Sequence, residues 1–270
     1  MPLNIPGLLV PFHLLVNPRL VIPHIIVNDI RQVDFRALKR AGYKGAVFDK
    51  DNCITLPQQD RLVPELQDSW RECREVFGEG NVLIVSNSAG TPSDAGGIQA
   101  ESVSHHLKVP VLQHASLKPS YACIKGIRAY FASLPGNKAE SKESSRPPRD
   151  SELVIIGDRI FTDVLLANRM RSSSSQSRLQ EQKSAPSGPG TLSIWTTGVW
   201  KKESMLMRFG EKKLVEAVRK WTTSPSSDPD TTGFVKGSWI DKVDEDGKET
   251  GTGSGGGVGW IWDKMRLRRT

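Results

Sequence analysis

Short runs of consecutive apolar residues alternate along this chain with segments in which apolar residues recur every three or four positions. The runs predict strands buried on both faces, as in a parallel sheet, and they lie at residues 44–49, 81–85, 109–112, 153–156 and 192–195. The spaced segments predict amphipathic helices, at residues 34–40, 62–77, 94–105, 119–131, 160–170 and 204–221. Strands that alternate with helices are typical of an α/β fold in which helices flank a parallel sheet.

Three polar stretches interrupt or follow this alternation. Residues 135–150 are charged and contain prolines, and residues 171–190 are rich in Ser, Gln and Pro. Both compositions predict flexible surface inserts. Residues 223–270 are rich in Gly, Ser and Asp until a basic end that contains two tryptophans, so we expect a flexible tail whose end is either an interfacial anchor or a docking patch. The α/β domain itself is expected over residues 41–222.

Residues 1–40 form an apolar arm ahead of this domain. Residues 8–27 are strongly apolar, but Pro11, Pro18 and Pro23 interrupt them. Interior prolines remove backbone hydrogen bonds and kink helices, so we do not expect a clean span through a bilayer. Two interpretations remain: a segment that associates with a membrane interface, or an arm that packs over the sheet as part of the core.

Composition narrows the class of protein only a little. The chain has 270 residues, of which 37% are hydrophobic and 25% charged, which suits one globular domain of ordinary size with loose segments. The net charge of +7 is compatible with nucleic acid, an anionic membrane or a phosphorylated substrate. The three cysteines, Cys53, Cys73 and Cys123, form no CxxC pair, so a disulfide framework is not expected.

Three of the predicted strands end in side chains that can carry chemistry. Asp49 and Asp51 follow the first strand, Ser86 and Asn87 the second, and Asp158 the fourth. The carboxyl ends of parallel strands meet at the edge of the sheet where open α/β proteins bind ligands. Residues i and i+2 of an extended segment point the same way, so Asp49 and Asp51 can face one point. A cation such as Mg²⁺ would relieve the repulsion between these two carboxylates.

Lys118 adds a positive charge to the same layer. Pro119 is a natural first residue of a helix, so we expect Lys118 at a helix N-terminus, which attracts anions. Taken alone, Lys118 is more simply a solvated lysine, Ser86 a turn former and Asp163 an acid in the first turn of a helix. Together the set provides a carboxylate nucleophile, a second carboxylate for proton transfer, phosphate-binding groups and a metal ligand, as phosphoryl transfer requires.

The order of these residues resembles the four motifs of the haloacid dehalogenase (HAD) superfamily. Residues 49–53 (Asp-Lys-Asp-Asn-Cys) resemble the first motif, Ser86 the second, Lys118 the third and residues 157–163 (Gly-Asp-Arg-Ile-Phe-Thr-Asp) the fourth. The resemblance covers about residues 40–200 and implies a HAD-like, Rossmann-like sheet. The interval between the first and second motifs leaves room for a helix but for no large cap domain. Cys53 departs from the pattern, because many superfamily phosphatases have Thr or Val there, and we expect it to pack near the sheet edge.

Within the superfamily, the chain is most similar to the mitochondrial phosphatidylglycerophosphate phosphatases of fungi and their bacterial relatives. The shared features are the Asp-Lys-Asp-Asn opening, the Val-Ser-Asn-Ser-Ala-Gly stretch, the Gly-Asp-Arg-x-x-Thr-Asp block and the proline-punctuated arm. The resemblance implies hydrolysis of phosphatidylglycerophosphate to phosphatidylglycerol, a step toward cardiolipin. It also implies a peripheral protein on the matrix side of the mitochondrial inner membrane, with a phospholipid substrate, contact with an anionic membrane and no nucleic-acid partner.

The resemblance also implies a role for each residue of the site. Asp49 would be the nucleophile and Asp51 the general acid and base, with Mg²⁺ held by Asp49, the Asp51 carbonyl and Asp158. Phosphate would be bound by Ser86, Asn87 and Lys118. In supporting roles, Asp163 would orient Lys118 or a metal-bound water, and Arg159 would either contact phosphate or pair with a neighbouring acid.

Two other functions remain open from the sequence. The same chemistry could act on a soluble phosphomonoester or a phosphoprotein, although the apolar arm favours a lipid. The chain could instead be a catalytically silent, membrane-associated scaffold. A silent scaffold has no chemical reason to keep Asp49, Asp51, Lys118 and Asp158 together.

Overall fold

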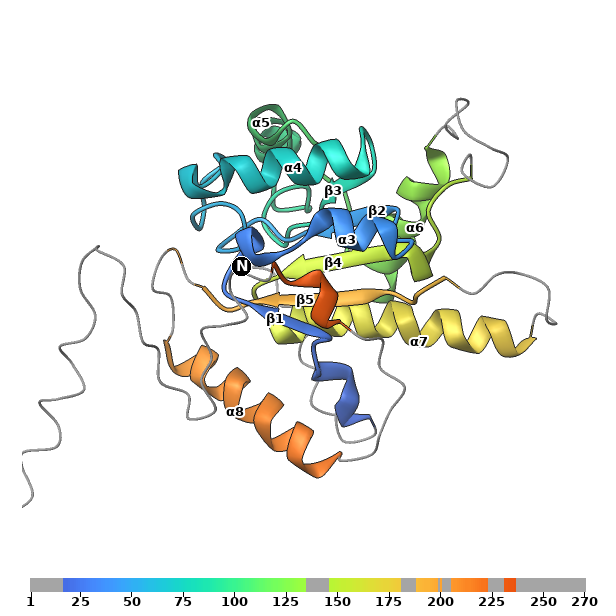
Figure 1. Ribbon diagram of the computed structural model, residues 1–270. Helices are drawn as coiled ribbons and strands as arrows, with labels where there is room; N and C mark the ends of the chain where they lie inside the picture. Colours follow the sequence, from blue (N-terminus) through green and yellow to red (C-terminus); the bar gives the residue numbers. More distant parts are fainter. Residues whose placement is uncertain are drawn as a thin grey trace, which may run out of the picture. The chain divides into compact units, whose positions relative to one another are not determined.

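The structure is a computed structural model that describes residues 17–134, 146–180, 188–198, 200, 205–222 and 231–236. These residues all belong to one compact unit, shown in Figure 1. The predicted tail from residue 237 onward, the inner parts of both predicted inserts and residues 1–16 of the arm lie outside the described residues.

A five-stranded sheet in the described residues places the strand ends at one edge. The strands are β1 (Ile25–Val27), β2 (Gly45–Phe48), β3 (Val82–Ile84), β4 (Leu153–Gly157) and β5 (Leu192–Thr196), in the order β1-β5-β4-β2-β3. All four neighbouring pairs are parallel. Strands β2 and β4 pair at the centre and are buried at every position, as expected from their continuous apolar runs.

Helices connect the strands and pack on the sheet. The α-helices are α3 (Phe35–Arg40), α4 (Gln67–Phe77), α5 (Ile98–Leu107), α6 (Tyr121–Ser133), α7 (Leu165–Gln180) and α8 (Met205–Trp221). Short helical turns are η1 (Pro18–Val21), η2 (Ile30–Gln32), η3 (Pro64–Leu66), η4 (Ala95–Gly97), η5 (Asp150–Glu152), η6 (Ile160–Val164) and η7 (Thr232–Phe234). None of the helices in the described part of the chain is both long and apolar enough to cross a bilayer.

Two apolar clusters cover the two faces of the sheet. Successive side chains of a strand point to opposite faces, so Ala46 and Phe48 join one cluster with α4, whereas Val47 joins the other with α6 and α7. Figure 1 shows α4 and α7 on opposite sides of the sheet. The resulting layers confirm the predicted α/β fold with a parallel sheet flanked by helices. All residues between Asp51 and Ser86 are described, and they contain only η3 and α4 as helices, so no large cap domain is inserted there.

Residues just before the predicted domain boundary at residue 40 take part in the sheet and its core. Strand β1 pairs with β5 at the edge of the sheet, and Phe35 and Leu38 of α3 are fully buried. Residues 17–40 therefore contribute an edge strand and buried side chains to the fold. The signal was weak in the sequence because β1 has only three residues and its middle residue, Ile26, is 40% exposed.

Two other predicted elements differ from the structure. Residues 109–112 form no strand, and only Val111 makes a bridge, to Ile84. Pro110 lies at this position and has no N–H to donate to a ladder. Helix α7 extends to Gln180, into the stretch predicted as a flexible insert from residue 171. A helix anchored by buried residues such as Leu166 and Met170 propagates readily, because each further residue adds a hydrogen bond without a new nucleation step.

Candidate active site

Asp49 is the first residue beyond β2, and the sheet fixes its main chain. Its N–H donates to the carbonyl of Ile156 in β4 at 2.9 Å, so the pairing of the two central strands continues to this point. The Asp49 side chain is 11% exposed, and its Oδ1 lies 2.8 Å from Lys118 Nζ. Burial raises the pKa of Asp49 to about 6, the Lys118 ammonium opposes this shift, and the nearby charge of Asp163 adds to it. A buried carboxylate in this position needs a cation to remain charged.

Lys118 is buried between two carboxylates. Its Nζ donates to Asp163 Oδ1 at 2.7 Å and lies 2.8 Å from Asp49. Burial lowers the pKa of Lys118, but the charges of Asp163 and Asp49 more than offset this and raise the pKa above its ordinary value. The ammonium therefore stays charged at neutral pH.

Asn87 contacts the main chain of Lys118, which lies just before the Ser120 cap of helix α6. The Asn87 amide accepts from the Lys118 N–H at 2.7 Å and donates to the Lys118 carbonyl at 3.4 Å. The Asn87 amide thus binds both the N–H and the carbonyl of Lys118, and these two contacts help to position Lys118. Helix α6 begins at Tyr121 and is capped by Ser120, so Pro119 is not the first helical residue and Lys118 lies in the loop before the cap.

Three acidic side chains meet at the carboxyl edge of the sheet. One ligand oxygen each from Asp49, Asp158 and Asp163 lie within 4.8 Å of one another. Oδ1 of Asp158 is buried and has no hydrogen-bond partner, which is costly for a carboxylate oxygen. Burial raises the pKa of Asp158 well above its ordinary value, and the charges of Asp49 and Asp163 add to this. The cluster and its unsatisfied oxygen fit a hard divalent cation, which takes oxygen ligands.

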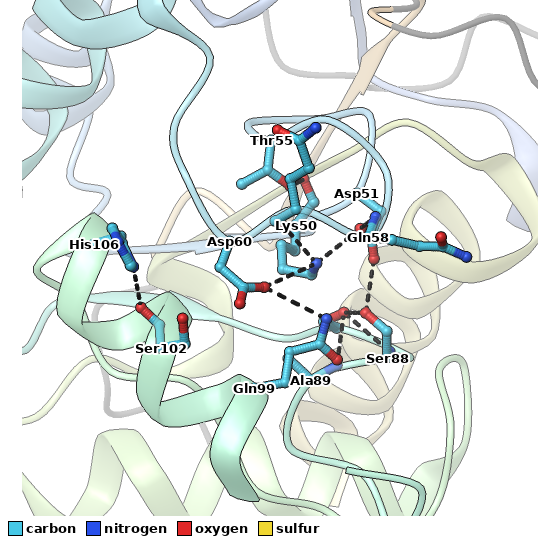
Figure 2. Close-up of polar contacts among 12 residues, drawn as sticks. Lys50, Asp51, Thr55, Gln58, Asp60, Ser88, Ala89, Gln99, Ser102 and His106 are labelled. Carbon is cyan, nitrogen blue, oxygen red and sulfur yellow. Dashed lines mark hydrogen bonds and ion pairs between the residues drawn. The ribbon is translucent and has the colours of Figure 1, made fainter.

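Asp51 and Ser86 are linked through Ser88, as Figure 2 shows in part. Asp51 Oδ2 accepts from Ser88 Oγ at 2.7 Å, and Ser88 Oγ lies 2.9 Å from Ser86 Oγ. Ser86 is fully buried, whereas the Asp51 side chain is 30% exposed. His114 Nε2 contacts the Ser86 carbonyl at 2.9 Å and so helps to hold the end of β3.

Cys53 and Arg159 lie beside these groups. Cys53 is fully buried and its Sγ faces the Ile156 carbonyl at 3.9 Å. Burial raises the pKa of this thiol well above its ordinary value, so it remains protonated and packs at the sheet edge. The main-chain N–H of Arg159 donates to Asp163 Oδ2 at 3.2 Å. Arg159 is an exposed residue.

Comparison with known proteins assigns the chain to a family. Residues 5–178 match the family described as mitochondrial PGP phosphatase, where PGP denotes phosphatidylglycerophosphate. This range covers well over half of the chain and contains Asp49, Asp51, Ser86, Lys118 and Asp158. The chain belongs to the mitochondrial PGP phosphatase family.

Three curated relatives are 35% to 40% identical to this chain over the aligned residues. The chloroplastic phosphatidylglycerophosphate phosphatase 1 of Chlamydomonas reinhardtii is 40% identical over 57% of this chain and 51% of its own length. The chloroplastic/mitochondrial protein of Arabidopsis thaliana is 36% identical over 62% of this chain and 44% of its own length. A mitochondrial phosphatidylglycerophosphatase of Saccharomyces cerevisiae is 35% identical over 63% of this chain and 84% of its own length. The chain thus spans about half the length of the first two relatives and most of the yeast protein. No solved structure matches the chain significantly.

Helix α8 contributes to the site of this PGP phosphatase family member from outside the matched residues. Val215 and Val218 pack against Trp195 and Ile160 and thereby hold the helix beside the end of β4. Arg208 Nη2 donates to Asp158 Oδ2 at 2.5 Å, on the carboxylate whose other oxygen has no partner.

Glu211 lies one turn along the same helix and is also buried. Burial raises its pKa to about 7, and the charges of Arg208 and Arg159 oppose this shift. Sequence reasoning recognised the amphipathic helix but did not assign Arg208 or Glu211 to the site. The spacing of residues within the helix gives no information about its contacts with a strand end that lies 50 residues earlier.

Proposed function

We propose that this protein is a Mg²⁺-dependent phosphatase that hydrolyses phosphatidylglycerophosphate to phosphatidylglycerol, in the direction of cardiolipin. The observation that carries the proposal is the buried contact of Lys118 with both Asp49 and Asp163, beside an Asp158 oxygen that has no partner. Relatives of this chain are named phosphatidylglycerophosphatases, which supports the choice of substrate. A site of this kind combines a nucleophile, a phosphate-binding cation and a metal-binding cluster.

In the proposed reaction, a carboxylate oxygen of Asp49 attacks phosphorus and the bond from phosphorus to the glycerol oxygen breaks. Asp51 gives its proton to the departing oxygen, so that an aspartyl-phosphate and the free hydroxyl of phosphatidylglycerol result. Asp51 then takes a proton from the water that attacks the aspartyl-phosphate, which releases phosphate and restores Asp49. Lys118 and Ser86 hold the phosphoryl oxygens, and Asn87 keeps Lys118 in place.

The proposed Mg²⁺ ligands are Asp49, the main-chain carbonyl of Asp51 and Asp158, and the carboxylate of Asp163 lies within reach of the same point. When bound, the ion neutralises negative charge on the phosphoryl group. The residues themselves support this choice, because Lys118 and Arg208 offset only part of the charge of the three acids. A phosphate group would otherwise approach a site that is still negative.

We further propose that the protein is mitochondrial and works as a peripheral protein on the matrix face of the inner membrane. Relatives named mitochondrial support the compartment. Membrane contact is supported by α8, whose Phe209 and Trp221 are 63% and 85% exposed near the exposed Lys212, Lys213 and Lys220. Exposed aromatic side chains together with lysines are typical of helices that bind anionic membrane surfaces.

Vesicle flotation tests the membrane contact. The full chain should float with vesicles that contain phosphatidylglycerol, and the double variant Phe209→Ser, Trp221→Ser should float much less. Ile98→Ser is a matched control, because Ile98 is 72% exposed on another helix. Equal flotation of all three proteins would remove α8 from the membrane-binding surface.

Phosphate release tests the function. The full chain is assayed on phosphatidylglycerophosphate in mixed micelles and on a soluble aryl phosphate, each with Mg²⁺ or with a chelator. We expect Mg²⁺-dependent release from the lipid, and loss of it in Asp49→Asn. Asp68→Asn is the control, since the Asp68 side chain is 88% exposed and pairs with Arg71 on the surface of α4.

The other outcomes discriminate between functions. Activity on soluble phosphates alone would favour a soluble phosphomonoester or phosphoprotein as the substrate. A folded protein that is inactive on both substrates would favour a silent membrane-associated scaffold.

A further inference from the structure

Lys50 lies in sequence between the two candidate catalytic carboxylates, and the proposed mechanism gives it no role. Its side chain is fully buried, with 0% exposure. Burying an ammonium group is expensive unless it is paired and hydrogen-bonded. A lysine at this position therefore needs partners within the protein, and those partners indicate what it does.

Three groups surround the Lys50 ammonium, as Figure 2 shows in part. Its Nζ lies 2.8 Å from Asp51 Oδ1 and donates to the carbonyl of Gln59 at 3.0 Å. Asp60 Oδ1 lies 3.9 Å away. Two of these partners belong to residues 58–60, which follow Asp51 in a small loop. Lys50 therefore connects Asp51 to this loop.

The loop is closed on itself by the main chain. Thr55 bridges to both Asp51 and Leu62, and the Gln58 N–H donates to Asp51 Oδ1 at 2.9 Å. The same carboxylate oxygen thus takes Lys50 from one side and Gln58 from the other. Because Lys50 also holds the Gln59 carbonyl, it fixes the loop that carries the Gln58 donor.

Three hydrogen-bond donors hold the Asp51 side chain in one orientation. Oδ1 takes Lys50 and Gln58, while Oδ2 takes Ser88. A carboxylate that is 30% exposed would otherwise sample several rotamers, and proton transfer requires placement within hydrogen-bond reach of the leaving oxygen. Without the Lys50 ammonium, Oδ1 would lose its charged partner, and the Gln59 carbonyl would lose its donor.

We propose that Lys50 is a positioning residue, which holds Asp51 in the orientation that delivers a proton to the leaving group. The inference rests on the phosphatase function proposed above and adds a residue to it. Lys50 itself does not touch the substrate in this scheme. Its removal therefore changes the reaction through Asp51, and the change depends on how much the leaving group needs a proton.

The experiment compares leaving groups in the variant Lys50→Met, which keeps the length of the side chain and removes its charge. The kcat/KM value is measured for the full chain with Mg²⁺ on an alkyl phosphate and on a series of aryl phosphates of decreasing leaving-group pKa. We expect a loss of about 10- to 100-fold on the alkyl phosphate, because general-acid catalysis contributes at least this much. The loss should shrink to a few-fold on the most activated aryl phosphate, which leaves without a proton.

A double-mutant cycle shows whether Lys50 acts through Asp51. The loss in Asp51→Asn should hardly increase when Lys50→Met is added, since residues that act as a unit are not additive. Lys44→Met is the matched control: Lys44 also pairs with an acid, Glu152, at 3.6 Å, but is 27% exposed. It should leave the dependence on the leaving group as in the wild type.

An equal loss on all leaving groups, or full additivity with Asp51→Asn, would overturn the inference and make Lys50 a structural ion pair. If circular dichroism shows that Lys50→Met is unfolded, Lys50→Arg takes its place and should steepen the same dependence, because the bulkier guanidinium displaces Asp51. A wild-type chain that is inactive on every phosphate would instead refute the proposed phosphatase function, so the two failures are distinct.

Discussion

Gly157, at the end of β4, lies directly against the side chain of Asp163. A Cβ built on Gly157 would overlap Cγ, Cβ and an oxygen of Asp163. The Asp163 carboxylate accepts a hydrogen bond from the Lys118 ammonium. It is one of the two carboxylates that contact this ammonium; the other is Asp49. The absence of a side chain at residue 157 is therefore a condition for the acidic cluster, because it allows Asp163 to reach Lys118.

Replacing Gly157 by Ala tests this at the scale of one residue. We expect Gly157→Ala to lower the melting temperature of the full chain by several degrees and to lower phosphatase activity, since overpacking costs about 1–3 kcal/mol and displaces Asp163. Gly210→Ala is the control, because no atom lies within 4 Å of a Cβ at that position of α8. It should be neutral or raise the melting temperature slightly, as Ala favours helices over Gly by about 1 kcal/mol. Similar melting temperatures for the two variants would show that the site tolerates a Cβ at residue 157.

At the scale of an element, α8 joins a core contact to a polar contact in the site. Val215 and Val218 are buried against the sheet layer that includes Trp195, and this packing carries Arg208 to Asp158. Arg208 binds one oxygen of Asp158 while the other has no partner. This is the geometry expected of an outer partner that orients the proposed metal-ligating carboxylate of Asp158.

We therefore predict that Arg208→Met weakens binding of a divalent cation. The loss should be about 10-fold or more, in the range known for partners of metal ligands, and Mn²⁺ binding followed by electron paramagnetic resonance measures it without any substrate. Lys212→Met removes a positive charge from an exposed position of the same helix and serves as the control. Tighter Mn²⁺ binding in Arg208→Met would mean that Arg208 competes with the ion for Asp158.

At the scale of the whole molecule, the buried acids couple stability to pH and to metal. The pKa of Asp49 is raised from 3.8 to about 6, mainly by burial, and the pKa of Asp158 is also raised. In the window from about pH 4 to pH 6, the folded state holds a proton at Asp49 that the unfolded chain has lost. The contribution to stability is thus fully present below the unfolded pKa and is lost as the pH rises through the folded value.

The expected result is that chelator-treated protein loses stability between pH 5 and pH 7.5, whereas Mg²⁺ stabilises it more at pH 7.5 than at pH 5. Thermal melting at both pH values, with and without the ion, measures this. In Asp49→Asn, which lacks the titrating group, the loss on raising the pH should be smaller. A metal-free protein that gains stability over this window, with the variant unchanged, would contradict the role of buried acids.

Much of the fold and part of the site follow from local sequence patterns. Four of the predicted strands and all six predicted helices are present, although boundaries shift, because continuous apolar runs and helical spacing report burial directly. The prediction that strand ends meet at one edge also holds for Asp49 and Asp158, since strands β2 and β4 are parallel neighbours. β1 was missed because three residues show too short a pattern.

The sequence by itself determined which chemistry is available, because strand ends with Asp49, Asp51 and Asp158 follow apolar runs that must lie in the core. Only the tertiary structure decided which other residues contact these groups and orient them. It placed the Asn87 amide on the main chain of Lys118, the Lys50 ammonium on Asp51 and the Arg208 guanidinium on Asp158. Such contacts depend on how side chains of distant segments are oriented once the elements pack, and no local period along the chain encodes that geometry.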